Sequence, residues 1–149
     1  MKPKIKSKSF KSRQRARRFA MQALYQWQLT AHSFVELRKQ FLAQEEMVSV
    51  DTAYFEALVQ GVITQQSVLD QQLVSALDRP LKELNLVECA ILRLAVYELL
   101  QCPELPYKIV LNEAIELAKE FGAIEGYKYV NGTLHALAKK LRPLEVNGS

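Results

Sequence analysis

The chain has 149 residues, of which 49% are hydrophobic, a size and composition typical of one globular domain. It holds no apolar run of about eighteen residues, and no apolar segment with a cleavage site follows its charged start, which excludes a membrane span and a secretory signal and predicts a cytoplasmic protein. Residues 1–18 contain nine Lys or Arg and no acid, whereas eleven basic and sixteen acidic residues follow from Phe19 onward, so a basic segment precedes a body of net charge −5.

The basic arm, residues 1–14, is predicted to be flexible because charges of one sign repel one another. Such tails most often bind nucleic acid, with a purely solubilising role as the alternative. After the arm, apolar residues recur at spacings of three and four, and no strand-like alternation persists. Residues 15–149 are therefore predicted to form a single all-helical domain.

Four helices are predicted in the first half of the chain. The first begins at about Arg15, and Asp51 is the predicted N-cap of the third, because its carboxylate can accept hydrogen bonds from the N–H groups that open a helix. The apolar positions repeat every three or four residues and are, in chain order, Ala16, Phe19, Ala20, Ala23 and Trp27; then Phe34, Leu37 and Phe41; then Tyr54, Leu58 and Val62; and then Leu69, Leu73 and Leu77.

The central part of the chain is predicted to hold a buried helix. Asp78-Arg79-Pro80 predicts that a helix restarts there, since proline is tolerated in the first turn after a capping Asp. Asn85 and Glu88 have the spacing of a capping box, in which each side chain bonds the other residue's N–H. The segment that follows, CAILRLAVYELL, is apolar almost all round and is predicted to be the buried central helix.

Two amphipathic helices are predicted at the end of the chain. YKIVLNEAIELAKEFG stops at Gly122, which suits a C-terminal cap, and the last helix covers Tyr127 to Leu141. Gly132 lies inside the last helix, where glycine costs about 1 kcal/mol relative to alanine. We therefore expect another backbone to approach closely at Gly132.

The first helix offers a candidate face for binding nucleic acid. Arg17, Arg18, Met21 and Tyr25 are expected on the side opposite the apolar face, with Arg18 and Tyr25 two turns apart along one line. The planar guanidinium of arginine matches a phosphate, and an exposed tyrosine offers a ring on which an unpaired base can stack. The alternative is that Tyr25 packs under a neighbouring helix.

The last helix repeats this arrangement. Lys128, His135 and Lys139 share the face opposite its apolar residues, and Tyr127 and Tyr129 flank Lys128 near the start of the helix. A helix start carries partial positive charge and free N–H groups, which also favours a phosphate.

The residues capable of chemistry do not form a catalytic or metal-binding constellation. His32 and His135 have no Cys, Asp or second His at ligand spacing, and the sequence has neither a Gly-rich phosphate loop nor a nucleophilic Ser motif. Cys89 and Cys102 match no zinc pattern and are predicted to be reduced, structural thiols. The sequence thus predicts no catalytic residue, no metal site and no cofactor.

Four segments from the start, centre and end of the chain form a recognisable set: ARRFAMQALYQWQL, VECAILRLAVYEL, LPYKIVLNEAIELAKEFGA and KYVNGTLHALA. Together they resemble the NusB family of bacterial transcription antitermination factors. The resemblance implies an all-α, NusB-like RNA-binding fold of about seven helices in two packed three-helix halves. It also implies a protein that binds the single-stranded boxA RNA element together with NusE, a small-subunit ribosomal protein. With other Nus factors at the transcription elongation complex, such proteins promote processive transcription of ribosomal RNA operons.

The resemblance also implies which residues bind each partner. The tail of this chain is longer and richer in Lys and Ser than the compact arginine run of the family. In the family the basic ribosomal protein docks on the acidic body, for which Glu83 and Glu88 are the candidate contacts here, with helix capping alone as their alternative role. By position, the RNA-binding residues are Arg13, Arg15, Arg17, Arg18, Tyr25, Lys128 and Tyr129.

Other function classes explain less of the sequence. The same fold occurs fused to ribosomal RNA cytosine methyltransferases, but no cofactor-binding α/β domain follows here. A helical protein–protein adaptor would make the basic tail incidental, and an RNA-binding fragment of an enzyme would need further sequence. The charge and the motifs together therefore predict an RNA-binding factor that is not an enzyme.

Overall fold

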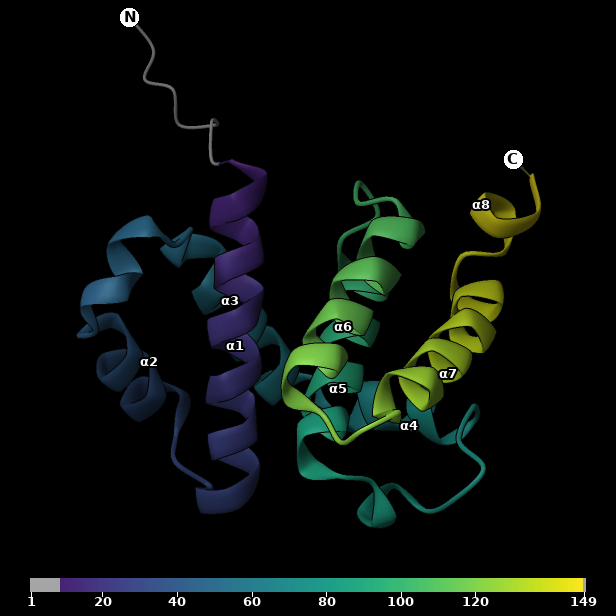
Figure 1. Cartoon of the computed structure of the whole chain (residues 1–149), viewed down its shortest axis with the longest axis horizontal. Helices are drawn as coiled ribbons and strands as arrows, with labels where there is room; N and C mark the ends of the chain where they lie inside the picture. The colour runs from purple at the N-terminus through teal and green to yellow at the C-terminus, as the bar shows by residue number, and fades with distance from the viewer. Residues whose placement is uncertain (1–8, 149) are drawn as a thin grey trace, which may run out of the picture. The chain divides into compact units, whose positions relative to one another are not determined.

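The computed structural model describes residues 9–148, and within this range it contains eight α-helices, two short 3₁₀ helices and no strand (Figure 1). The all-α prediction is confirmed. None of the helices in this range is long and apolar enough to cross a membrane. The α-helices are α1 (Phe10–Thr30), α2 (Phe34–Leu42), α3 (Thr52–Thr64), α4 (Gln66–Val74), α5 (Leu86–Gln101), α6 (Tyr107–Phe121), α7 (Gly126–Leu141) and α8 (Pro143–Gly148), and the 3₁₀ helices are η1 (Glu45–Ser49) and η2 (Leu81–Glu83).

The chain divides into two compact units, Met1–Gln60 and Gly61–Ser149, in agreement with the expected two helical halves. The first unit contains α1, α2 and most of α3, and the second contains the end of α3 and all later helices. Helix α1 begins at Phe10 rather than Arg15, because the Ser9 hydroxyl caps it by accepting a hydrogen bond from the N–H of Ser12 at 3.0 Å. Residues 10–14 of the predicted flexible arm are therefore helical, and residues 1–8 lie outside the described range.

Aromatic side chains join the three helices of the first unit. Phe19 and Phe41 meet edge to face with ring centroids 6.5 Å apart, and Phe41 lies 5.9 Å from Phe55 by the same measure. Asp51 caps α3 as predicted, since its Oδ1 accepts the N–H of Tyr54 at 3.1 Å. This core fixes α1 against the start of α3, which determines where the basic side chains of α1 point.

Helices α5, α6 and α7 pack on one another in the second unit (Figure 1). Residues from Glu88 to Leu99 are buried except for the half-buried Tyr97, so the prediction that α5 is the buried central helix is confirmed. The apolar helix accommodates a buried Arg93 because the guanidinium forms two hydrogen bonds of 2.9 Å with the carboxylate of Asp70 on α4.

The segment between α4 and α5 departs from the prediction. Asp78-Arg79-Pro80 does not restart an α-helix: Pro80 is extended, with ψ of 144°, and only the short η2 follows before Leu84 is extended again. Helix α4 ends at Val74, which leaves Leu77 beyond it. Asn85 does cap α5, with its Oδ1 accepting N–H groups at 2.8 and 3.3 Å.

The Glu88 side chain does not complete the predicted capping box. It is only 7% exposed, and its Oε2 accepts the N–H of Ala123 in the α6–α7 connection at 3.3 Å. A Cβ atom at Gly126 would overlap this carboxylate, and one at Gly122 would lie 2.7 Å from the carbonyl oxygen of Ala118. Gly122 ends α6 as predicted, but with an ordinary φ of −84°. These two glycines therefore leave space for neighbouring groups. The close approach predicted at Gly132 is wrong, because apart from the adjoining residues and the nearby backbone of α7 itself, no atom of the described residues lies within 4 Å of a Cβ there.

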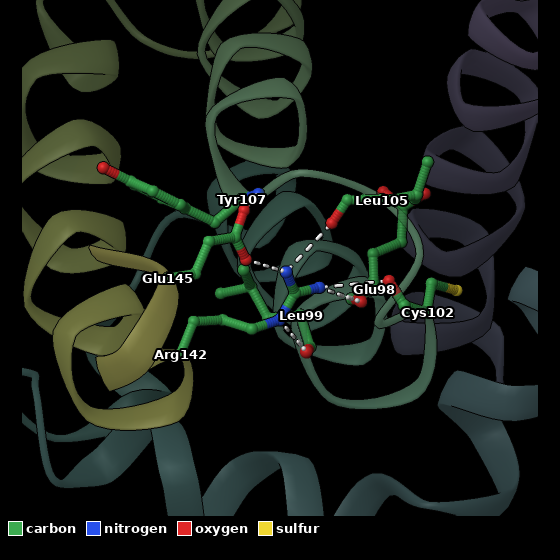
Figure 2. Close-up of polar contacts among 7 residues, drawn as sticks. All are labelled: Glu98, Leu99, Cys102, Leu105, Tyr107, Arg142 and Glu145. Atoms are coloured by element: carbon green, nitrogen blue, oxygen red, sulfur yellow. Dashed lines mark hydrogen bonds and ion pairs between the residues drawn. The ribbon is translucent and has the colours of Figure 1, made fainter. Parts of the chain in front are cut away.

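Helix α8 was not predicted, and Arg142 attaches it to the corner between α5 and α6 (Figure 2). The Arg142 guanidinium donates to the carbonyl oxygens of Leu99 at 2.8 Å, Leu105 at 2.9 Å and Cys102 at 3.0 Å, with a longer bond of 3.4 Å to Glu98. It also pairs with Glu145 at 2.6 Å, and the second oxygen of Glu145 accepts the N–H of Tyr107 at 2.8 Å. The Arg142–Glu145 ion pair thus provides hydrogen-bond partners for carbonyl oxygens at the end of α5 and for the first N–H group of α6.

Candidate nucleic-acid interface

The structure separates the arginines of α1 into two groups. Arg17 is 2% exposed, and its guanidinium lies over the ring of Tyr54 at 5.5 Å. Met21 is buried too, so the expectation that both residues face solvent is wrong. For Arg17 the reason is that Tyr54 of α3 lies against this side of α1, which the periodicity of α1 alone does not reveal.

Arg13 lies one turn before Arg17 and contacts the same ring. Its guanidinium is 4.7 Å from the Tyr54 centroid, and its Nε donates to the buried Asp51 at 3.4 Å. A cation over an aromatic face is stabilised by the ring quadrupole. Tyr54 and Asp51 were not predicted to contact the arginines, and their three-residue spacing carries no signal of it in the sequence.

The second group on α1 is accessible from solvent. Arg15 is exposed, with a long hydrogen bond of 3.5 Å to the carbonyl oxygen of Ser49, and Lys11 is exposed as well. Arg18 and Tyr25 are half-buried. The first unit therefore offers cations and a partly accessible ring on one helix, a combination that can bind a phosphate and stack a base.

In the second unit, Lys128 and Tyr129 lie in the first turn of α7. The Lys128 side chain is 63% exposed and pairs with Glu125 at 2.5 Å. The hydroxyl of the half-buried Tyr129 donates to Asp78 Oδ1 at 3.1 Å. Burial and this bond raise the pKa of the Tyr129 phenol, which keeps the ring neutral. The expected accessible cation beside a tyrosine is thus present on this helix.

Arg79 and Asp78 join Tyr129 from the connection between α4 and η2, and sequence reasoning missed this contact. The Arg79 guanidinium lies over the Tyr129 ring at 4.5 Å and donates from Nε to Asp78 at 2.9 Å. Hydrogen bonds from Arg79 and then Tyr129 lower the pKa of the Asp78 carboxyl. The 50 residues that separate Arg79 from Tyr129 explain why no local pattern reveals the pair.

The two candidate contacts for a protein partner differ in accessibility. Glu83 is exposed at the end of η2. Glu88 is buried, and its carboxylate accepts the N–H of Ala123, so its role in the structure is to bond the α6–α7 connection and not the helix capping that was its alternative. Cys89 and Cys102 are buried thiols, as predicted. No group of three or more metal-ligating side chains is found among residues 9–148.

The helical fold and the accessible cations beside tyrosines describe an all-α protein with a candidate surface for a polyanion. The NusB family model matches residues 14–139, and the chain belongs to the NusB family. Among curated relatives, the transcription antitermination protein NusB of Shewanella amazonensis is 51% identical over 86% of this chain and 96% of its own length. The NusB of Alcanivorax borkumensis is 49% identical, over 91% of each chain, and that of Legionella pneumophila is 43% identical, over 96% of this chain and 97% of its own.

Solved structures agree with this membership. A NusB structure from T. maritima superposes with a TM-score of 0.75 at 29% identity, covering 85% of this chain and 89% of that chain. A crystal structure of the antitermination factors NusB and NusE in complex with double-stranded RNA gives a TM-score of 0.77 at 26% identity, covering 89% of this chain and 99% of the matched chain. The NusB-like fold prediction is therefore confirmed.

Proposed function

We propose that this chain is a transcription antitermination factor that binds boxA-type single-stranded RNA together with the ribosomal protein NusE. It acts by binding, not as an enzyme, at the transcription elongation complex in the cytoplasm. The observation that carries the proposal is the alignment, at 43–51% identity and over most of each chain, with proteins named for transcription antitermination. The likeness to the NusB–NusE–RNA complex supports RNA and NusE as the two ligands.

The accessibility of the basic residues supports a division of roles on α1. Arg15 and Arg18 are the phosphate contacts of the first unit, with Tyr25 as the ring on which a base stacks. Arg17 is buried over Tyr54, so its main role is to hold α1 in place, whereas Arg13, which is 40% exposed over the same ring, remains a candidate phosphate contact. Lys128 and Tyr129 are the contacts contributed by α7. The basic arm, residues 1–14, adds attraction for the polyanion.

The charge of the body supports a separate site for the protein partner. A net charge of −5 from Phe19 onward attracts a basic ribosomal protein, and the exposure of Glu83 supports its assignment as a contact of that partner. Because a basic partner beside the RNA extends the positive surface, we expect the two ligands to strengthen each other's binding. Linkage requires the same factor in both directions, with about 5- to 150-fold as the typical range.

The test is a titration of labelled boxA-type RNA with the full chain, in the presence and absence of purified NusE. Single-stranded, double-stranded and scrambled RNAs of equal length form the three arms, because the related complex contains double-stranded RNA. We expect the single-stranded boxA sequence to bind with the highest affinity, and more tightly when NusE is present. Absence of RNA binding under both conditions would overturn the proposal, and binding of NusE alone would identify a protein–protein adaptor.

A further inference from the structure

Arg79 has the geometry of a ligand-binding residue and is not among the residues that the family resemblance assigned. Its guanidinium is held on two sides: the Tyr129 ring lies 4.5 Å beneath it, and Asp78 accepts its Nε–H at 2.9 Å. Asp78 is itself oriented by the Tyr129 hydroxyl, which donates to the same Oδ1 atom at 3.1 Å. The three side chains thus fix the plane of the guanidinium before any ligand arrives.

The donors of Arg79 remain available for a ligand. A guanidinium has five N–H groups, and one of them, on Nε, bonds Asp78. The side chain is 46% exposed, and the structure records no further hydrogen bond from it to any residue in the range 9–148. The two terminal nitrogens therefore present a planar fork of donors to solvent, which is the arrangement that binds a phosphate through two oxygens.

The contact with Asp78 does not exclude an anionic ligand. Both partners are exposed, with Asp78 at 71%, and an exposed ion pair contributes little because water screens it. The carboxylate accepts from Nε, and no hydrogen bond from the terminal nitrogens to a residue in the range 9–148 is recorded.

We infer that Arg79 binds a backbone phosphate of the RNA, with Tyr129 and Asp78 holding its guanidinium in position. The inference rests on the proposed RNA-binding function and extends it to a residue outside α1 and α7. It also changes the role of Tyr129, whose ring supports the cation on one face. Lys128, in the same turn of α7 as Tyr129, is a further exposed cation on this helix.

The experiment compares Arg79→Gln with Arg38→Gln in the full chain. Arg38 is a matched control because its side chain is 48% exposed and its Nε pairs with Glu56 at 2.8 Å, but no aromatic ring beneath it is recorded in the described residues. Binding of a boxA-type single-stranded RNA oligonucleotide is measured by fluorescence anisotropy at several salt concentrations. Melting curves of the same samples report folding.

Arg79→Gln is expected to weaken RNA binding by about ten-fold, since a hydrogen bond to a charged group is lost. It is also expected to reduce the slope of log affinity against log salt by about 0.7, the value for one phosphate of a single strand. Arg79→Lys should restore the slope but not the full affinity, because lysine keeps the charge and lacks the fork. All three variants should melt as the wild type does.

An Arg79→Gln variant with the affinity and the salt slope of Arg38→Gln would overturn the inference while leaving the proposed function intact. A salt slope that Arg79→Lys does not restore would also overturn it, since the charge itself would then not contact a phosphate. If the wild-type chain binds no RNA, the proposed function fails first and this inference fails with it.

Discussion

Replacing Arg142 with Met is expected to destabilise the second unit strongly. The guanidinium is 10% exposed and donates to backbone carbonyls at the end of α5 and in the α5–α6 connection, as well as to Glu145 (Figure 2). The last carbonyls of a helix have no partner within the helix, so they depend on such donors. Methionine fills a similar volume but donates nothing, which leaves these acceptors and the carboxylate without their common partner.

The magnitude follows from the loss of one member of a part-buried network, in which the Arg142 side chain is 10% exposed and that of Glu145 is 35% exposed. Removing one partner of a fully buried ion pair costs about 3 to 5 kcal/mol, so the low end of this range, about 3 kcal/mol, is expected here, and the individual hydrogen bonds are not summed because they share one donor group. For a chain of this size each kcal/mol lowers the melting temperature by about 2 to 4 °C, so a decrease of about 10 °C is expected. Arg142→Lys should lose a large part of this stability, because an ammonium cannot reach carbonyls on both sides of the corner.

Thermal melting followed by circular dichroism measures this effect, with Arg38→Met as the control. Arg38 forms an exposed ion pair with Glu56, so its replacement should change stability by less than about 1 kcal/mol. If Arg142→Met melts within the range of Arg38→Met, the corner does not depend on the guanidinium and the reasoning is refuted.

The pH dependence of Glu145 gives a second readout of the same network. The hydrogen bond from the Tyr107 N–H, and then the bond from Arg142, lower the pKa of the Glu145 carboxyl. A lowered pKa in the folded state means that the stabilisation is complete above the ordinary glutamate pKa of about 4.3 and is lost as the pH falls through the folded value. The difference in melting temperature between wild type and Glu145→Gln should therefore be largest near neutral pH and should decrease in acid. A difference that grows in acid would contradict the assigned contacts.

Three further outcomes are expected. Tyr25→Ala should weaken RNA binding by about five-fold or more if a base stacks on the ring, and a lower melting temperature with unchanged affinity would instead identify Tyr25 as a core residue. Arg17→Gln should lower the melting temperature, whereas Arg15→Gln should reduce the salt slope of RNA binding by about 0.7 without changing stability; identical behaviour of the two variants would contradict the division of α1. Glu83→Lys should weaken NusE binding in calorimetry and leave RNA binding by the isolated chain intact or slightly stronger, while an unchanged NusE affinity would remove Glu83 from that site.

Local patterns in the sequence predicted most of the helices. Spacings of three and four located the core faces, and short-range chemistry located Asp51 and Asn85 as caps and Gly122 as a helix end. These features depend on contacts within a few residues, which a sequence displays directly. The errors at Pro80 and Gly132 arose where a local rule allows two outcomes. A proline after Asp can start a helix or lie in an extended turn, and Pro80 is extended. A glycine inside a helix can mark a close approach or face open space, and Gly132 faces open space.

Contacts between distant segments were beyond local patterns. Glu88 had the correct spacing for a capping box, yet its carboxylate bonds the N–H of Ala123, 35 residues further along the chain. The absence of a side chain at Gly126 makes this possible, because a Cβ there would occupy the position of the carboxylate. The sequence shows Glu88 and Gly126 but not that they lie against each other. For this reason the buried carboxylate of Glu88 was predicted to be an exposed contact for a protein partner or a helix cap.

The same limitation applies to the number of basic side chains that RNA phosphates can contact. Residues 1–18 contain nine Lys or Arg side chains, but this number is an upper limit on the phosphate contacts of that segment. Arg17 is buried over Tyr54, and Arg13 contacts both Tyr54 and Asp51. In the second unit too few candidate cations were predicted, because no motif identified Arg79. The positive surface available to a polyanion is therefore determined by which arginines the fold buries, as it buries Arg17, and which it leaves exposed, as it leaves Arg79. The salt dependence of binding is the measurement that counts the exposed cations that contact phosphates.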